Sequence, residues 1–369
     1  MTPLWDIVAD KEVIICGGSG GVGKTTVSAA LGAELARAGR RAVVVTIDPA
    51  RRLADALGVT MEPGKVLQVN LQDCPGSLHA MMLTPELAVE TFMRKLNADP
   101  HNPLVHDRFF QQGMAMLAAS PEYLAVQELH DLHDSKQWDV IVLDTPPTRQ
   151  SIDFLTAPGR LARALKDKSV VVELARPYLR INKMGFNLIK AGAKAILSII
   201  DKFFGIETFI EFFTFFELAV TLLDLDRLEE RLNTVNTLLQ ASTTTFLVVA
   251  APSPVSIEEA LYFHQKISDY HIAFGGFVIN RVQAEPLCGA LPETLDAPTL
   301  GGYDVLPTVF PKLLQNLRDV QHLRQLEQAE IGRLSAILRE QECLVQVPRL
   351  ALDVHDLAGI VLIGEALRG

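Results

Sequence analysis

A glycine-rich segment near the amino terminus constrains the fold more than any other feature of this 369-residue chain. Residues Gly18–Thr25 read GSGGVGKT and match the pattern GxxxxGK[ST]. The apolar run Val13–Cys16 precedes the segment, and Lys24–Ala38 follows it with helical character that ends at Gly39. Because glycine lacks a Cβ atom, such a segment lets several backbone N–H groups converge on one anion. The sequence therefore predicts a strand, a phosphate-binding turn and a helix, in that order.

The residue types in this segment suit a nucleoside polyphosphate with a metal ion. Lys24 supplies a positive charge for the β- and γ-phosphates and is a candidate catalytic residue, and Thr25 supplies a hydroxyl for Mg²⁺. The positive end of the helix that begins near Lys24 also favours an anion. We therefore expect ATP or ADP with Mg²⁺. The residues expected to contact the nucleotide are Gly18, Ser19, Gly20, Gly21, Val22, Gly23, Lys24, Thr25 and Thr26.

Short apolar runs alternate with helical stretches along most of the chain. Strands that alternate with helices form parallel β-α-β units, because each helix returns the chain to the same edge of the sheet. The predicted fold is α/β: a three-layer P-loop NTPase with a mostly parallel, doubly wound sheet. The expected strands after Val13–Cys16 are Ala42–Ile47, Val66–Leu71, Val140–Leu143, Phe246–Ala251 and Gly276–Ile279.

Polar residues stand at the carboxyl ends of several predicted strands, where doubly wound sheets bind ligands. Asp144 follows an apolar strand and is expected to be the second anchor for Mg²⁺, the alternative being an ordinary strand-end residue. Asp48 follows the second strand and is placed to orient an attacking water, although an aspartate before Pro49 also suits a turn. Asn280 ends the last predicted strand. We expect these side chains to lie near the glycine-rich segment.

Two stretches interrupt the alternation of strands and helices. Residues at about 84–133 and 177–236 show helical spacing without a clear strand, and we interpret them as segments of a helical subdomain inserted into one P-loop ATPase domain over residues 1–369. Pro286–Thr308 contains several Pro and Gly residues and predicts a long loop.

Charge and cysteine content argue against nucleic-acid binding and against cysteine-based cross-links. The formal net charge of −10 argues against a general nucleic-acid binder, because phosphate backbones are held by excess Lys and Arg. The four cysteines form no CxxC pair, so we expect neither a zinc clamp nor a disulfide framework.

Two segments bear on the cellular location. The amino terminus has no basic region followed by an apolar run, so we expect no signal peptide and a cytoplasmic protein. Phe203–Leu223 has the length of a membrane span but contains Glu207, Glu211 and Glu217. A charge near the centre of a bilayer costs at least about 2.5 kcal/mol, so the segment is not expected to cross a membrane.

Three ordered motifs together resemble one family, the ArsA-type ATPases, which include the arsenite-pump ATPase and the guided-entry ATPase that targets tail-anchored membrane proteins. The motifs are GGSGGVGKTT at Gly17–Thr26, DPARRLADAL at Asp48–Leu57 and DTPPT at Asp144–Thr148. The resemblance extends from about Val13 to the end of the chain. Three motifs in the right order are much more specific than any one of them.

The resemblance implies a dimeric ATPase whose two nucleotide sites face each other and whose helical subdomains change shape when ATP binds. It implies that Asp48 activates the hydrolytic water, that Asn280 recognises adenine and that Pro307 belongs to a loop covering the adenine. It also implies that residues Thr145–Gln150 sense the γ-phosphate. The implied switch residues are Asp48, Pro49, Asp55, Asp144, Thr145 and Pro146.

The chain departs from the family pattern at positions that affect partners. The family carries a signature lysine early in the loop, where this chain has Ser19, so we expect either a homodimer or a heterodimer with a lysine-bearing paralogue. The CxxC that binds zinc in the eukaryotic targeting ATPase is absent, so no zinc is expected. The second switch continues with Arg149 and Gln150 rather than with Gly and His.

Seven phenylalanines gather between residues 203 and 216. They do not form one narrow helical stripe, so such a helix needs more than one partner surface. One interpretation is packing within the subdomain or against a dimer mate, and the other is a groove for a hydrophobic client. The residues expected to line the groove are Phe209, Phe212, Phe213 and Phe216.

These observations predict Mg²⁺-dependent ATP hydrolysis that drives a dimeric conformational switch. The leading biological role is ATP-gated chaperoning or targeting of a hydrophobic or membrane-protein client, with peripheral attachment to a membrane. The first alternative is an ATPase subunit that energises extrusion of arsenite or another anion through a membrane channel. A nucleotide-dependent assembly or positioning switch is a third hypothesis.

Overall fold

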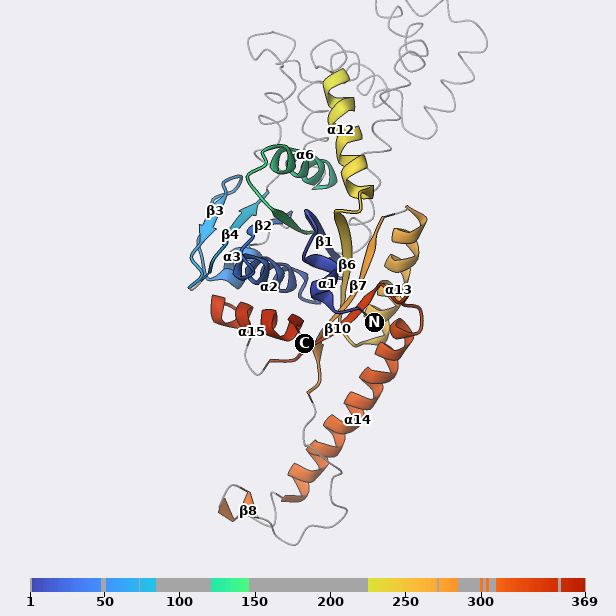
Figure 1. Cartoon of the computed structure of the whole chain (residues 1–369). Coiled ribbons are helices and arrows are strands. Elements are labelled where there is room, and N and C mark those ends of the chain that lie inside the picture. Colours follow the sequence, from blue (N-terminus) through green and yellow to red (C-terminus); the bar gives the residue numbers. More distant parts are fainter. Residues whose placement is uncertain are drawn as a thin grey trace, which may run out of the picture.

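A mostly parallel sheet of eight strands forms the centre of the described structure (Figure 1). This computed structural model describes residues 2–47, 51–72, 74–83, 121–145, 225–270, 272–284, 299–300, 303–304, 310–350 and 353–368. The predicted α/β fold with a doubly wound sheet is confirmed. The eight strands are β1 (Val13–Gly18), β2 (Arg41–Thr46), β3 (Leu67–Val69), β4 (Ser77–Met82), β5 (Val140–Asp144), β6 (Thr244–Ala250), β7 (Phe274–Val282) and β10 (Cys343–Pro348).

The strand order brings the candidate residues to one edge of the sheet. The order is β10-β7-β6-β1-β5-β2-β4-β3, so β1 lies between β6 and β5. Neighbouring strands are parallel except for β3 and β4. The register places Cys16 of β1 beside Asp144 of β5, and Gly18 beside Val249 of β6. Because the central strands run in the same direction, their carboxyl ends meet at this edge.

Helices cover both faces of the sheet (Figure 1). Because α14 continues past the sheet, its amino-terminal half projects from the rest of the described structure. One face is covered by α1 (Leu4–Val8), α2 (Lys24–Arg37), α3 (Arg52–Leu57) and α15 (Leu357–Arg368). The opposite face is covered by α6 (Pro121–Asp134), α12 (Leu225–Gln240), α13 (Pro254–Asp269) and α14 (Phe310–Ser335).

The continuous apolar runs of the sequence have a direct explanation in this arrangement. Val13 and Ile15 of β1 pack into the cluster under α12 and α13, whereas Ile14 and Cys16 pack into the cluster under α2. Successive side chains of a strand point to opposite faces, and here both faces are covered by helices. Each fully buried aliphatic side chain stabilises the fold by about 2 kcal/mol, so a polar residue in β1 would be costly.

All six predicted strands are present, and two strands of the eight-stranded sheet were not predicted. The prediction at Val66–Leu71 is confirmed only as a three-residue strand, β3, which lies antiparallel at the sheet edge. The sequence analysis missed β4 because its sequence, SLHAMM, has few β-branched residues. It also missed β10, a short strand at the opposite edge that ends in Pro348.

The long loop predicted over Pro286–Thr308 is wrong in its described part. Strands β8 (Thr299–Leu300) and β9 (Tyr303–Asp304) pair there as a short antiparallel hairpin. Each strand is only two residues long, which is too short to show an apolar pattern among the surrounding Pro and Gly residues.

The helical segments predicted at 84–133 and 177–236 fall mostly outside the described residues, as do Phe209, Phe212, Phe213 and Phe216. The described parts are helical: α6 and α12 pack against each other, and Arg231 of α12 donates hydrogen bonds to Gln127 and Asp131 of α6. Within the described ranges, no helix combines the length and apolar character that crossing a membrane requires.

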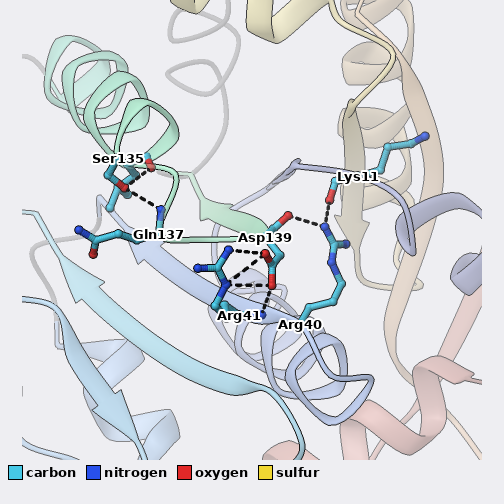
Figure 2. A network of polar contacts seen from close by, with 7 residues as sticks. Lys11, Arg40, Arg41, Ser135, Gln137 and Asp139 are labelled. Carbon is cyan, nitrogen blue, oxygen red and sulfur yellow. Dashed lines mark hydrogen bonds and ion pairs between the residues drawn. The ribbon is translucent and has the colours of Figure 1, made fainter.

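A polar network fastens the amino-terminal ends of β2 and β5 to the turn before β1 (Figure 2). The Arg40 guanidinium donates hydrogen bonds to the carbonyl oxygens of Ala9 at 2.9 Å, Lys11 at 2.6 Å and Asp139. The adjacent Arg41 donates its backbone N–H to the Asp139 carboxylate at 2.7 Å and pairs with it through Nη2 at 2.6 Å. These hydrogen bonds from Arg41 hold the pKa of the Asp139 carboxyl below its usual value. The network therefore holds together the amino-terminal ends of these strands, and the glycine-rich segment lies at the opposite, carboxyl-terminal ends.

Replacing Arg40 with Met is expected to lower the free energy of unfolding by about 2 kcal/mol, because the partly buried carbonyl oxygens of Lys11 and Asp139 lose a charged donor. Arg41→Met is the matched control. Its side chain is exposed, so its loss should be clearly smaller than that of Arg40→Met. Urea denaturation followed by circular dichroism measures both losses. Equal losses for the two variants would contradict a special role for Arg40.

Candidate functional site

The glycine-rich segment forms a turn between β1 and α2, as the sequence predicts. Gly18, Gly21 and Gly23 have φ angles of 144°, 77° and 91°, values that favour glycine. A Cβ atom on Gly18 would lie 2.0 Å from the carbonyl oxygen of Val249, and one on Gly23 would lie 2.2 Å from Nδ2 of Asn280. Two of these glycines are therefore required by close approach as well as by backbone conformation.

Lys24 is the first residue of α2 and folds back over the turn. Its side chain is buried at 7% exposure, and its Nζ donates a hydrogen bond to the carbonyl oxygen of Ser19 at 2.8 Å. The positive charge is thereby held inside the turn, beside the backbone N–H groups. This arrangement is suited to binding an anion with several oxygen atoms.

A buried carboxylate joins three elements of the site. Asp144 ends β5 with 1% exposure, and its Oδ2 accepts hydrogen bonds from Thr25 Oγ1 at 2.7 Å and from Thr46 Oγ1 at 2.8 Å. A hydroxyl that donates its proton keeps its lone pairs, so Thr25 can still serve as a metal ligand. Thr25 and Asp144 together offer the hard oxygen donors that Mg²⁺ prefers. The sequence analysis missed Thr46, whose signal was a hydroxyl at the end of a valine-rich strand.

Thr145, the residue after this carboxylate, is bonded to Cys16 of β1. Thr145 is buried and donates its backbone N–H and its hydroxyl to the carbonyl oxygen of Cys16, at 3.2 and 2.8 Å. These bonds anchor the start of the DTPPT motif to the sheet. Burial raises the pKa of the Cys16 thiol to about 12, so this thiol is neutral and unreactive at physiological pH.

Asn280 reaches the turn from a distant part of the chain. It is buried near the end of β7, and its Nδ2 donates a hydrogen bond to the carbonyl oxygen of Val22 at 2.8 Å. Its Oδ1 accepts a hydrogen bond from the backbone N–H of Arg281 at 2.9 Å. Arg281 also donates from Nη1 to the carbonyl oxygen of Gly21 at 3.2 Å. The end of β7 is thus connected to the turn at two points.

A cavity of about 600 Å³ opens beside Asn280. It combines an apolar wall with polar groups, a composition common among small-molecule sites. Neither β10 nor α15 was among the predicted site elements, because the short apolar run before Pro348 gives no local sign of its neighbour β7 in the sheet. The lining residues are Thr26, Asn280, Arg281, Pro348, Arg349, Leu350, Asp353, Val354 and Ile363.

Ser19 is turned inward rather than toward solvent. Its side chain is 9% exposed, and its Oγ lies 3.0 Å from the Oγ of Ser256 at the start of α13. The Oγ of Ser256 in turn accepts the backbone N–H of Ala251 at 3.0 Å. The sequence analysis missed Ser256, because nothing in the local sequence indicates that it meets the turn.

Of the remaining predicted site residues, most lie outside the part of the chain that the structure describes. Asp48, Pro49, Pro146 and Pro307 lie outside the described residues. Asp55 lies on α3 with its side chain exposed. Among the described residues, no cluster of three or more His, Cys, Asp or Glu side chains could hold a metal ion.

Comparison with known proteins gives one family match. The profile of a family described as anion-transporting ATPase, ArsA_ATPase, matches residues 11–291. A protein named ATPase get3 from Aspergillus terreus (strain NIH 2624 / FGSC A1156) is 26% identical over 285 residues, which cover 76% of each chain. ATPase get3 from Schizosaccharomyces pombe (strain 972 / ATCC 24843) is 26% identical over 277 residues, or 74% of each chain. A putative arsenical pump-driving ATPase 1 from Aquifex aeolicus (strain VF5) is 28% identical over 177 residues, which cover 45% of this chain and 44% of that protein.

Two glycines of the turn give a matched test of this geometry. Gly21→Ala should cost about 1 kcal/mol of stability, because φ is 77° but no atom lies within 4 Å of the added Cβ. Gly23→Ala should destabilise the protein by about 1–3 kcal/mol more than Gly21→Ala, because the added Cβ displaces Asn280 from the carbonyl oxygen of Val22. Urea denaturation of both variants measures the difference. A Gly23→Ala variant as stable as Gly21→Ala would show that Asn280 is not fastened to the turn.

Proposed function

Because the chain belongs to the ArsA family of anion-transporting ATPases, we propose that it binds ATP with Mg²⁺ at the carboxyl ends of β1 and β5 and hydrolyses it. One observation carries the proposal. Lys24, Thr25 and Asp144 meet at the turn after β1, and Thr25 donates a 2.7 Å hydrogen bond to Asp144. This set provides an anion site and a Mg²⁺ site side by side, as phosphoryl transfer requires.

The protein groups have separate tasks in this proposal. The backbone N–H groups of the turn and Lys24 bind the phosphate oxygens and stabilise the charge that develops on them. Thr25 and Asp144 would hold Mg²⁺, which neutralises charge on the phosphates when it is bound. Asp144 also fixes the direction of the Thr25 hydroxyl proton, so that a lone pair remains available.

Asn280 is proposed to recognise adenine through its remaining hydrogen-bonding capacity. A neutral amide has two N–H donors and two acceptor lone pairs, and Val22 and Arg281 each use one. One donor and one acceptor remain, which matches the acceptor and donor that adenine presents along its N7 and N6 edge. Guanine presents two acceptors there, so it fits less well. The apolar residues of the adjoining cavity offer a surface for the flat face of the base.

Asp48 is proposed to orient the water that attacks the γ-phosphate. It follows Thr46 by two residues, and the Thr46 hydroxyl is bonded to Asp144. A carboxylate at this point of the chain can accept a proton from the water while Lys24 stabilises the phosphate charge. The bond from water oxygen to phosphorus forms, the bond to the leaving oxygen of ADP breaks, and the products are ADP and inorganic phosphate.

Steady-state ATPase activity is the first test. The wild-type protein should hydrolyse ATP only with Mg²⁺, and Asp48→Asn should lower kcat at least about 100-fold because a general base is lost. ATP binding by Asp48→Asn, measured by calorimetry, should stay within about threefold of wild type. Asp10→Asn is a suitable control because its side chain is exposed and it precedes β1, at the opposite end of this strand from the turn. Undiminished hydrolysis by Asp48→Asn would contradict the assignment.

The ATPase measurement also distinguishes a homodimer from a heterodimer. We propose that the ATPase acts as a dimer, and the inward-facing Ser19 supports a partner that supplies a cation to the site. If wild type binds ATP but hydrolyses it only after a lysine-bearing paralogue is added, the heterodimer is supported. A stable homodimer with full activity in sedimentation and ATPase assays would rule out the heterodimer.

For the biological role, we propose ATP-gated handling of a hydrophobic client. The dense phenylalanines at 203–216 in the sequence support it. Extrusion of arsenite or another anion is the second candidate, favoured by the family description and by the pump-driving relative. Two of the three described cysteines weaken that candidate, because Cys16 and Cys343 are buried and burial raises the pKa of each thiol to about 12. A thiol that stays protonated is a poor metalloid ligand.

A client-binding assay separates the two roles. With ATP present, the protein should bind a 20-residue apolar peptide, and replacing both Phe212 and Phe213 with Ser should weaken binding at least about tenfold through lost apolar contact. Replacing both with Leu is the control and should retain most of the binding. Stimulation of the ATPase by arsenite or antimonite, without peptide binding, would contradict the client role and support the pump.

A further inference from the structure

Arg281 has an unusual backbone conformation at the nucleotide site. Its φ is 62°, and in the described part of the chain Lys136 is the other non-glycine residue with positive φ. This conformation costs an L-residue roughly 1–2 kcal/mol, and it persists where surrounding contacts compensate for it. Arg281 has two such contacts: its backbone N–H binds Oδ1 of Asn280, and its guanidinium binds the carbonyl oxygen of Gly21. Strain of this kind often marks a functional position.

We propose that Arg281 is a second phosphate-binding cation of the site, in addition to Lys24. In this inference, which rests on the proposed function, the guanidinium leaves the Gly21 carbonyl when a nucleotide binds and donates hydrogen bonds to its phosphate oxygens. Arg281 thereby makes the site selective for phosphorylated nucleosides over nucleosides alone.

The position of the guanidinium supports a phosphate rather than a base as its ligand. Its Nη1 lies 3.2 Å from the carbonyl oxygen of Gly21, in the middle of the turn whose N–H groups converge on the anion. The same side chain lines the cavity beside Thr26 and Asn280. It therefore lies between the proposed base pocket and the phosphate turn, where the phosphate chain of a bound nucleotide would begin.

The exchange of partners is energetically reasonable. The bond to Gly21 is long, exposed and made to a neutral oxygen, so its net contribution is small. A guanidinium bound to phosphate makes shorter, charge-assisted bonds and can use two N–H groups at once. Lys24 also donates to a carbonyl of the turn, that of Ser19. Both cations are therefore held next to the anion site by hydrogen bonds to neutral carbonyl oxygens of the turn.

The backbone and the side chain of Arg281 have separable tasks. The backbone N–H keeps Oδ1 of Asn280 in place, and any substitution other than Pro preserves this group. Arg281→Met keeps most of the aliphatic stem and removes the charge. It should therefore leave recognition of the base intact while weakening the hold on the phosphates.

The test compares the dissociation constants of adenosine, ADP and ATP with the full-length protein, by competition against a fluorescent adenine nucleotide. For Arg281→Met we expect ADP and ATP to bind at least about tenfold more weakly and adenosine to change less than twofold. The control is Arg349→Met, which removes the same charge from the same cavity at the end of β10. It should leave the ratio of adenosine to ATP affinity within twofold of wild type.

Three results would overturn the inference. One is unchanged affinity of Arg281→Met for ADP and ATP, and another is a loss of adenosine affinity by the same factor as that of ATP, which indicates a purely structural residue. Equal phosphate-dependent losses in Arg281→Met and Arg349→Met would assign the effect to the overall charge of the cavity. A wild-type protein that binds ATP no more tightly than adenosine would instead refute the proposed nucleotide site itself, so the two failures are distinguishable.

Discussion

The Oδ2 atom of Asp144 accepts hydrogen bonds from Thr25 at the start of α2 and from Thr46 at the end of β2. A buried carboxylate is costly unless hydrogen bonds stabilise its charge, so this arrangement is stable only if all three elements keep their positions. The neighbouring β1 then has little freedom, because Cys16 pairs with Asp144 and accepts the backbone N–H of Thr145. The position of the glycine-rich turn therefore depends on this carboxylate, through Thr25 at the start of α2 and through β1.

The second half of the site comes from strands β7 and β10, which lie on the opposite side of β1 from β5. Strand β7 brings Asn280 and Arg281 against the turn, and β10 brings Pro348 to the wall of the adjoining cavity. Helix α15 completes this wall with Ile363 and packs against α2. The proposed phosphate and base sites therefore use segments more than 250 residues apart in the sequence, which the parallel sheet and these hydrogen bonds bring together.

The contacts that stabilise the sheet and the candidate site lie at opposite ends of the central strands. Arg40 and Asp139 fasten the amino-terminal ends of the strands, and the candidate ligand-binding residues gather at the carboxyl-terminal ends. This separation lets the carboxyl-terminal ends carry a strained residue such as Arg281, since the rest of the sheet is fixed elsewhere. It also accounts for the glycines: the turn after β1 needs close backbone approach and positive φ angles, and both would destabilise a strand.

The sequence by itself determined the features that depend on local spacing. The turn at Gly18–Thr25, the buried strand before it and the carboxylate of Asp144 could be predicted because residues close in the chain specify them. Only the tertiary structure decided which distant side chains meet there. Thr46, Ser256 and Arg281 carry no local signal, and their contacts depend on the order of strands in the sheet, which apolar periodicity does not encode. Strand β10 escaped prediction for a related reason: a short edge strand needs a neighbour to define it, and its neighbour β7 lies more than 60 residues earlier in the chain.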